Sequence, residues 1–332
     1  MRAVQVAGAG SRFELVEREV TQPGRGEVLV RVAACGVCHS DVMAQAGMAT
    51  AYPRVPGHEV AGRVEALGES VTQWDVGQRV GIGWFGGACF TCAACREGDF
   101  ISCRVGKVTG LSADGGYADH VVAPQDALAA VPDALSDAEA APLMCAGVTT
   151  FNALRESGAR GGDLVAVVGL GGLGHLGVQF AAAMGFEVVA VARGEEKGRF
   201  ASQLGAHHYV DSTSQDVAAE LRRLGGAQTV LSTVTDASAT TATVGGLRHR
   251  GRLVVVGAPH EPLQVSAGAL IGPSSMVAGH ASGTAKDSED TLRLAARSRV
   301  RPMVETAPLE DAEDAFGRMM AGTPRFRMVL TT

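Results

Sequence analysis

Four cysteines lie within 15 residues of one another, spaced as Cys89-x2-Cys92-x2-Cys95-x7-Cys103. Four thiolates at this spacing can close around one tetrahedral Zn²⁺ and leave no position open for a substrate, which is typical of a structural site. An iron–sulfur cluster also uses four cysteines, but the spacing differs from the bacterial ferredoxin run and no proline follows Cys103. The spacing therefore favours a structural zinc ion.

A glycine-rich segment directly follows the apolar run 164–168 and precedes a stretch with helical character. Such glycines permit a tight turn and let the backbone approach a pyrophosphate, whose charge then lies at the N-terminus of the helix. This placement predicts a dinucleotide site, and the alternative is an ordinary strand-to-helix turn. The segment consists of Gly169, Leu170, Gly171, Gly172, Leu173 and Gly174.

The next apolar run ends at Ala192 and Arg193, where a site for NAD has an acidic residue that accepts the adenosine ribose hydroxyls. An arginine at this place favours a 2′-phosphate, and Lys197 could add positive charge to the same pocket. Glu195 and Glu196 lie close by, and Arg193 could instead stack on adenine or face solvent. The sequence favours NADP(H) over NAD(H).

Three further residues of metal-binding type, Cys38, His58 and Cys145, are scattered along the chain. Two thiolates and one imidazole form the ligand set of a catalytic zinc site, which keeps one position open. Their spacing alone does not join them. The alternative, in which Cys145 is a small buried residue and His58 an ordinary turn residue, is equally supported by residue type.

The elements that must position these residues change in character along the chain. Alternating apolar residues separated by Pro–Gly turns predict that the first third is mostly β. Long apolar runs after residue 163 are typical of a parallel sheet buried on both faces. We expect strands at 28–32, 60–64, 164–168, 187–191, 229–231, 253–256 and 327–330, and helices at 137–143, 148–155, 178–184, 290–296 and 310–320.

The composition excludes several classes of protein. A chain of 332 residues with 46% hydrophobic and 19% charged residues has the material for two folded domains. Its net charge of −6 has the wrong sign for a nucleic-acid-binding surface. We expect a cytoplasmic protein, because the N-terminus lacks an apolar leader. Residues 164–186 carry no charge, but six glycines argue against a membrane span.

Taken together, the motifs resemble those of the zinc-containing medium-chain alcohol dehydrogenases, and most of all the microbial branch that includes yeast alcohol dehydrogenase. The likeness covers nearly the whole chain, in family order: Cys35-Gly-Val-Cys-His-Ser-Asp41, Gly57-His-Glu59, the four cysteines, Cys145-Ala-Gly-Val-Thr149 and the glycine-rich turn. It implies an α/β fold with a β-rich, GroES-like catalytic domain interrupted by a Rossmann domain with a doubly wound parallel sheet. The expected boundaries are 1–146, 147–281 and a return to the catalytic domain over 282–332.

The resemblance assigns Cys38, His58 and Cys145 as ligands of a catalytic zinc ion, so that two Zn²⁺ are expected per chain. Glu59 corresponds to a residue that lies behind the metal and can coordinate it transiently. Asp41 corresponds to the carboxylate that orients a ligating imidazole.

The resemblance also implies the residues around the substrate and the cofactor. Ser40 corresponds to the hydroxyl that exchanges a proton with the substrate oxygen, and His39 and Arg327 correspond to residues near the cofactor pyrophosphate. Trp84 corresponds to an aromatic that lines the substrate pocket, although core packing is the plainer interpretation of a large aromatic. Many relatives end the proton relay with a histidine where this chain has Met43, so His39 or a water chain would have to replace it.

The activity implied is hydride transfer between a nicotinamide cofactor and a primary alcohol or its aldehyde, in a homodimer or homotetramer. A polyol or cinnamyl-type dehydrogenase of the same superfamily is the nearest alternative, and a non-catalytic zinc-lobe binding module is a remote one. Cys35-x-x-Cys38-His39 is also a literal c-type haem attachment sequence, but a cytoplasmic chain is poorly placed for that chemistry. A thioredoxin-like role for the same pair is disfavoured by its β-rich surroundings.

Overall fold

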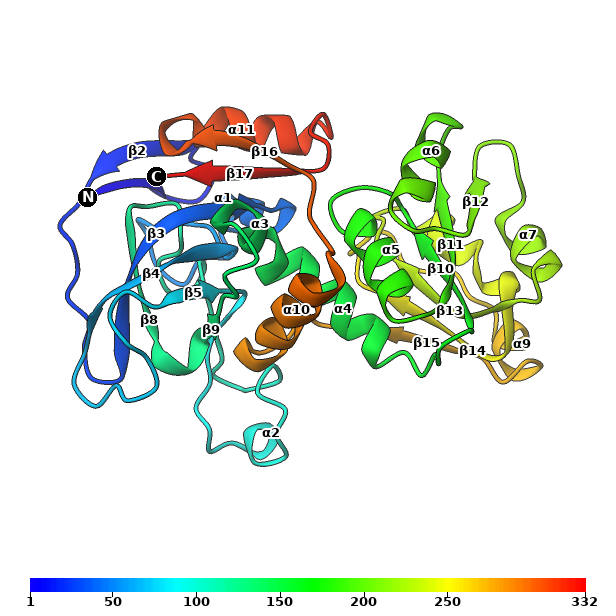
Figure 1. Ribbon diagram of the computed structural model, residues 1–332, viewed down its shortest axis with the longest axis horizontal. Helices are drawn as coiled ribbons and strands as arrows, with labels where there is room; N and C mark the ends of the chain where they lie inside the picture. The colour runs from blue at the N-terminus through cyan, green and yellow to red at the C-terminus, as the bar shows by residue number, and fades with distance from the viewer. The chain divides into compact units, whose positions relative to one another are not determined.

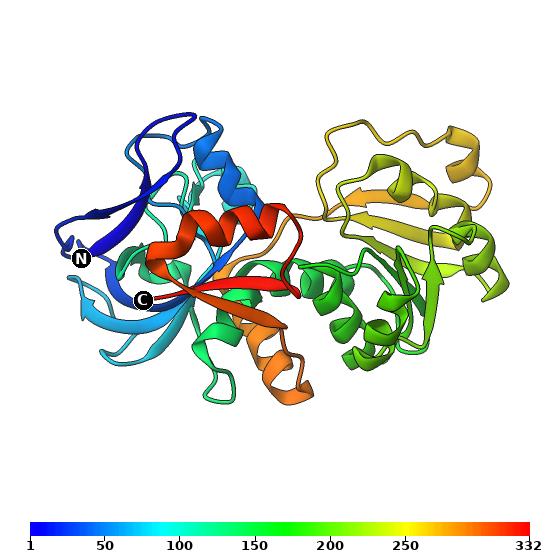
Figure 2. The ribbon, with the colours of Figure 1, turned by 90° about the horizontal axis from the view of Figure 1, so that it is seen from above.

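The computed structural model describes residues 1–332, which form two compact units. The first unit comprises Met1–Val148, Gly283–Arg297 and Pro302–Thr332, and the second comprises Thr149–Ser282 and Ser298–Arg301. Both chain ends therefore lie in the first unit, as Figures 1 and 2 show.

The first unit is built on a seven-stranded sheet in which β3 (Glu27–Val37) pairs with β4 (Val60–Leu67) and with β17 (Arg327–Thr331). Both pairings are antiparallel, and β17 brings the C-terminal segment against residues 34–37. Valine side chains of β3 and β4 fill the core beneath the sheet, because β-branched residues suit a pleated, buried surface. The other strands of this sheet are β5 (Arg79–Ile82), β8 (His120–Pro124), β9 (Leu128–Ala130) and β16 (Val304–Pro308).

Two small sheets and several short helices complete the first unit. One sheet pairs β1 with β2 and the other pairs β6 with β7, and α11 packs on β2 and β17. The bounds are β1 (Arg2–Val6), β2 (Phe13–Glu17), β6 (Phe85–Gly87), β7 (Lys107–Val108), η1 (His39–Asp41), α1 (Val42–Gln45), α2 (Ala93–Arg96), η2 (Gln125–Ala127), α3 (Asp137–Pro142), η3 (Leu143–Gly147), α10 (Ala285–Ser298), η5 (Leu309–Asp311) and α11 (Ala312–Met320).

The second unit is a six-stranded parallel sheet with the order β12-β11-β10-β13-β14-β15. The order reverses between β10 and β13, which is the arrangement of a doubly wound dinucleotide-binding fold. α5 packs on β10 and β11, α6 on β11 and β12, and α7 on β12 and β14. The bounds are β10 (Leu164–Val168), β11 (Glu187–Ala192), β12 (His208–Asp211), β13 (Ala227–Ser232), β14 (Leu247–Val255), β15 (Met276–Gly279), α5 (Gly174–Ala183), α6 (Glu196–Gln203), α7 (Val217–Arg223), α8 (Ala237–Thr241), η4 (Val244–Gly246) and α9 (Ala267–Ile271), and α4 (Val148–Arg155) leads into the unit.

The expected fold class is confirmed, and two helices are longer than predicted. α5 begins at Gly174 rather than near residue 178, because the glycine-rich turn leads straight into it. α10 begins at Ala285 rather than near residue 290, because Thr284 and Asp287 form a reciprocal cap. The uncharged stretch 164–186 forms β10, the turn and α5, and no helix of the chain has both the length and the apolar character to cross a membrane.

Candidate functional site

The scattered residues Cys38, His58 and Cys145 come together in the first unit, beside Glu59. Cys38 follows β3, His58 and Glu59 precede β4, and the pairing of Cys35 with Val60 brings these two strand ends together. Cys145 comes from η3, and its sulfur lies 4.0 Å from that of Cys38. One ligand atom from each of the four residues lies within 4.8 Å of the others. This set is called the open cluster below.

Asp41 orients the open cluster from behind. Its Oδ1 lies 3.1 Å from His58 Nδ1, and its Oδ2 accepts hydrogen bonds from the Cys38 amide at 2.9 Å and the Tyr117 hydroxyl at 2.8 Å. His58 Nε2 is therefore turned the other way, and it is buried with no hydrogen-bond partner. A buried ring nitrogen held in this orientation is suited to bind a metal ion.

Cys38 supplies negative charge to the open cluster, and Glu59 is a buried carboxyl group beside it. The pKa of the Cys38 thiol lies well below its usual range, because the Cys145 thiol donates to it and His58 adds favourable charge, which together outweigh burial. Glu59 is fully buried and pairs with Arg327, while its second oxygen has no partner. Burial raises the pKa of Glu59 to about 7 despite the opposing charge of Arg327.

Ser40 and His39 lie on η1 between Cys38 and Asp41, with Ser40 half-buried and His39 exposed. The rings of Trp84 and His58 pack in a T-shaped arrangement, with centroids 4.9 Å apart and planes at 88°. Met43 is half-buried and packs against the core, so no titratable side chain stands at the relay position.

The four-cysteine segment forms a separate lobe around α2, which projects from the first unit in Figure 1. Four of its six sulfur–sulfur separations run from 3.5 Å for Cys92 and Cys95 to 4.0 Å for Cys89 and Cys95, and all four sulfurs lie within 4.8 Å of one another. A tetrahedron with 2.3 Å zinc–sulfur bonds has edges of about 3.8 Å, so the four sulfurs match it. Hydrogen bonds from the hydroxyl and amide of Thr91 and the amide of Cys92 lower the pKa of Cys89 to about 5. Cys35 lies outside both clusters, and burial raises its pKa well above the usual range.

The glycine-rich turn links β10 to α5 in the second unit. Gly169 has φ of +92°, and a side chain on Gly174 would overlap the Gly169 carbonyl. Gly171 has open space around it, which leaves its backbone accessible to a ligand. These are the properties that close approach to a pyrophosphate requires.

Arg193 directly follows β11 and is exposed, while Lys197 lies in the first turn of α6 and is half-buried. Asp211, at the end of β12 and paired in register with Ala192, was missed by the sequence reasoning. Its Oδ1 accepts hydrogen bonds from the Gly194 amide at 2.9 Å and from the amide and hydroxyl of Thr213. No local sequence pattern marks it, because the pairing of β11 with β12 brings it beside Gly194.

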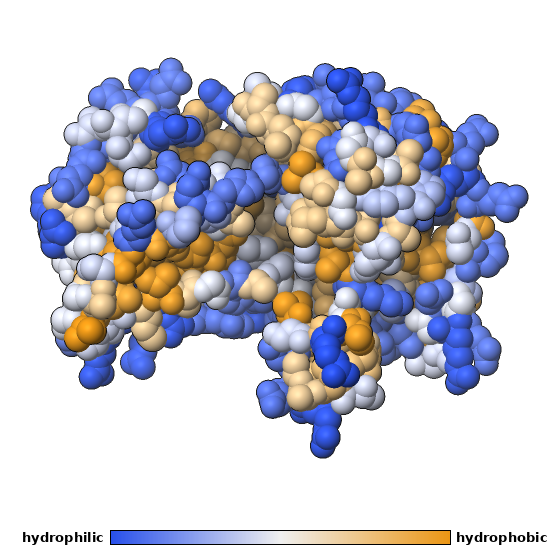
Figure 3. Space-filling view, turned by 180° about the vertical axis from the view of Figure 1, so that it is seen from behind, coloured by the Kyte–Doolittle hydropathy of each residue, from blue (hydrophilic) through white to orange (hydrophobic).

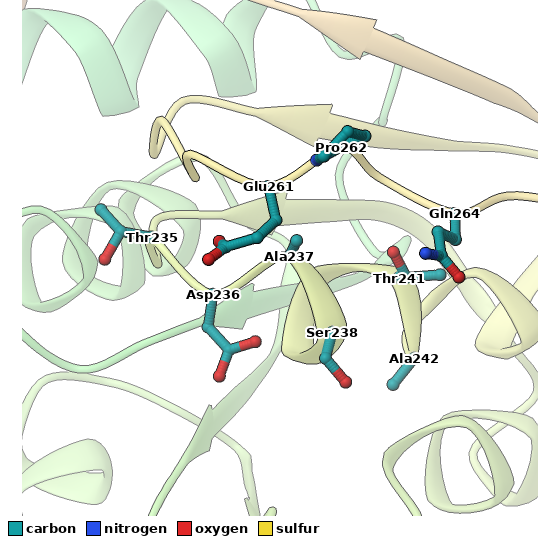
Figure 4. A pocket seen from close by; sticks show the side chains of 9 residues that line it. All are labelled: Thr235, Asp236, Ala237, Ser238, Thr241, Ala242, Glu261, Pro262 and Gln264. Atoms are coloured by element: carbon teal, nitrogen blue, oxygen red, sulfur yellow. The ribbon is translucent and has the colours of Figure 1, made fainter.

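A hollow of about 780 Å³ lies in the second unit beyond β13 (Figure 4). None of the predicted site residues lines it. Asp236 already accepts a hydrogen bond from the Ala239 amide as the cap of α8, and the hollow is open to solvent along exposed side chains. It is lined by Thr235, Asp236, Ala237, Ser238, Thr241, Ala242, Glu261, Pro262 and Gln264.

Comparison with known proteins gives a consistent result. Residues 24–133 match the family model described as "Alcohol dehydrogenase GroES-like domain", and residues 172–297 match "Zinc-binding dehydrogenase". The chain is 42% identical to alcohol dehydrogenase patD of Penicillium expansum over 97% of its length and 95% of the relative's. It is 40% identical to an alcohol dehydrogenase of Geobacillus stearothermophilus over 99% of both chains. A solved structure of a cinnamyl alcohol dehydrogenase from Sorghum bicolor has a TM-score of 0.89 and 30% identity, covering 99% of this chain and 97% of its own.

Proposed function

The chain belongs to the zinc-dependent medium-chain alcohol dehydrogenases, and on this premise we propose that its open cluster is the catalytic zinc site. The observation that carries the proposal is the buried, unpartnered His58 Nε2, which faces two thiols while Asp41 holds the other side of the ring. Cys38, His58 and Cys145 would hold the ion and leave one position open.

Zinc in such a site, when bound, acts as a Lewis acid that lowers the pKa of an alcohol or polarises a carbonyl. The residues of the chain would bind this ion and hold its ligands in the required orientation. Asp41 fixes the His58 ring, and Arg327 holds Glu59 behind the ligand set. Ser40, next to Asp41 on η1, is the group proposed to exchange a proton with the substrate oxygen, and Trp84 is proposed to wall the substrate pocket.

The four-cysteine lobe is proposed to hold a second, structural zinc ion. Four sulfur–sulfur separations of 3.5 to 4.0 Å fit a closed tetrahedron, and four thiolate ligands leave no position for a substrate. The test for both ions is metal analysis of the purified protein with a panel of small and aromatic alcohols and aldehydes. We expect two zinc ions per chain and turnover of several of these substrates. One zinc ion per fully active chain would contradict the assignment.

We propose NADP(H) as the preferred cofactor, bound with its pyrophosphate at the turn from Gly169 to Gly174. Ala192 cannot accept a hydrogen bond through its side chain, whereas the exposed Arg193 makes no ion pair within the chain and is free to pair with a 2′-phosphate. A charge-assisted hydrogen bond of about 1.5 to 3 kcal/mol corresponds to about a 10- to 100-fold preference in kcat/KM.

The cofactor preference is tested by the double substitution Ala192→Asp and Arg193→Leu. The new carboxylate accepts from the ribose and repels the phosphate, so we expect the preference to shift toward NAD(H) by about 10- to 100-fold in kcat/KM. Arg12→Leu, at an arginine of the first unit whose side chain is 88% exposed, is the matched control for general loss of positive charge, and it should leave the ratio unchanged. A wild-type enzyme that already prefers NADH would contradict the proposal, and Arg193 would then be assigned to adenine stacking or solvent.

A homo-oligomer is proposed to form at the outer edge of the second unit. β15 ends the six-stranded sheet, and an open strand edge can pair with another chain. Met276 and Val277 of β15 are 46% and 36% exposed, and Ile271 of α9 is 75% exposed. Figure 3 shows apolar atoms gathered on this side of the unit. Sedimentation that gives only a monomer would contradict this proposal.

A further inference from the structure

Tyr117 is linked to the open cluster by one side-chain hydrogen bond, which its hydroxyl makes to Asp41. The tyrosine is fully buried, and its hydroxyl donates to Asp41 Oδ2 at 2.8 Å. The same carboxylate lies 3.1 Å from His58 Nδ1 and accepts from the amide of Cys38 at 2.9 Å. One carboxylate therefore connects the tyrosine to two of the residues proposed as zinc ligands.

The position of the Tyr117 ring is fixed by the segment that carries His58. The Tyr117 amide donates to the Pro56 carbonyl at 3.1 Å, and a side chain at Gly57 would overlap the Tyr117 ring. Phe13 covers the ring edge-on, with centroids 5.8 Å apart. The hydroxyl cannot turn away from Asp41 without displacing this packing.

A buried carboxylate depends on its hydrogen bonds, because no water replaces a lost partner there. Without the Tyr117 hydroxyl, Asp41 Oδ2 would keep only the Cys38 amide. The carboxylate would then be free to rotate about its Cβ–Cγ bond, and the His58 ring would lose its fixed direction. Removal of a group that hydrogen-bonds to a metal ligand commonly reduces metal affinity or activity by about 10- to 100-fold.

We propose that Tyr117 is a positioning residue for the catalytic metal: by holding Asp41, it fixes the direction of His58 Nε2 and of the Cys38 segment. The inference rests on the proposed function, since it takes the open cluster to be the catalytic zinc site. The Tyr117 hydroxyl donates to Asp41, and the tyrosine acts on the proposed ligands through this carboxylate.

The test compares Tyr117→Phe with Tyr52→Phe in the intact two-zinc enzyme. Tyr52 is the matched control, because its hydroxyl donates to the Ala44 carbonyl at 2.6 Å and not to Asp41. Zinc transfer to a chromogenic chelator should show about three- to tenfold weaker binding at one of the two sites in Tyr117→Phe only. Cobalt placed in the weakened site should show a changed visible spectrum, and kcat should fall while KM for the cofactor stays the same.

A double-mutant cycle with Asp41→Asn separates positioning from general packing. If the tyrosine acts through the carboxylate, Tyr117→Phe should have little further effect on metal affinity once Asp41 is changed. Additive effects, or a lower melting temperature with unchanged zinc affinity and spectrum, would overturn the inference. A wild-type chain that holds zinc only in the four-cysteine lobe would instead overturn the proposed function.

A direct probe covers the case in which Tyr117→Phe does not fold. The chain has three tyrosines, so 3-fluorotyrosine in a Tyr52→Phe and Tyr209→Phe background labels Tyr117 alone. Its fluorine resonance should shift when zinc is removed from and returned to the open cluster. A resonance that does not respond to this zinc would overturn the inference.

Discussion

The four-cysteine lobe takes its ligands from one segment of 15 residues, whereas the open cluster collects its groups from three segments between residues 38 and 145. In the lobe, neighbouring groups such as Thr91 and the Cys92 amide hydrogen-bond to the sulfurs. In the open cluster, side chains distant in the sequence hold the two carboxyl groups beside the ligands: Tyr117 donates to Asp41, and Arg327 pairs with Glu59.

If both clusters bind the proposed metal ions, this difference separates a site whose structure depends on its own metal from a site that the surrounding fold holds in place. A short loop with four thiols has little core of its own, so metal binding there supplies folding free energy. Two segments of the open cluster lie at the ends of β3 and β4, whose valines pack in the core of the first unit. Loss of the two proposed metal ions should therefore have different consequences, one for local stability and the other for chemistry.

The largest expected effect is the loss of activity in Cys145→Ala. Cys145 is half-buried and contacts the Cys38 sulfur, so its removal empties a ligand position without breaking the core. Lewis-acid stabilisation worth several kcal/mol would be lost, and kcat/KM should fall by about a thousandfold or more. Steady-state kinetics and metal analysis measure the effect, with one zinc ion lost per chain.

Cys35→Ala is the matched control for Cys145→Ala. Cys35 is a buried thiol outside both clusters, so its removal should lower the melting temperature slightly and leave zinc content unchanged. If Cys145→Ala is about as active as Cys35→Ala, the open cluster is not required for catalysis and this prediction is wrong.

An intermediate effect is expected for Cys92→Ala in the lobe. Three thiolates remain, so the closed site weakens and the lobe opens more often. Arg96, Arg104 and Lys107 are exposed on this segment, and trypsin should cut it about tenfold faster or more. The activity of the uncut protein should fall far less than in Cys145→Ala. Unchanged proteolysis would show that the lobe is stable without its metal.

The same contrast explains what the sequence could predict. The lobe was predictable from spacing, because all of its ligands lie in one short segment. The glycine-rich turn was predictable because a local backbone requirement determines it. The grouping of Cys38, His58 and Cys145 required a resemblance, since strand pairing brings them together. Tyr117 and Asp211 were missed because only the tertiary structure places them beside Asp41 and Gly194.

The smallest expected effect compares two glycines that have the same backbone conformation. Gly57 has φ of +96° and lies beside His58, while Gly98 has φ of +86° in the lobe. A side chain at Gly98 meets nothing within 4 Å, so Gly98→Ala should cost only left-handed strain, about 1 to 2 kcal/mol. A side chain at Gly57 would overlap the Tyr117 ring and crowd the Cys35 sulfur, which adds about 1 to 3 kcal/mol.

Gly57→Ala should therefore lower the free energy of unfolding by about 1 to 3 kcal/mol more than Gly98→Ala does, as measured by denaturant unfolding of the zinc-loaded proteins. Because the Tyr117 ring cannot move without disturbing Asp41 and His58, Gly57→Ala should also reduce kcat several-fold although no ligand is changed. Gly98→Ala should leave kcat unchanged. Equal activities in the two variants would mean that the open cluster tolerates movement of the residues around it. The surrounding fold would then not be what holds the open cluster in its active geometry.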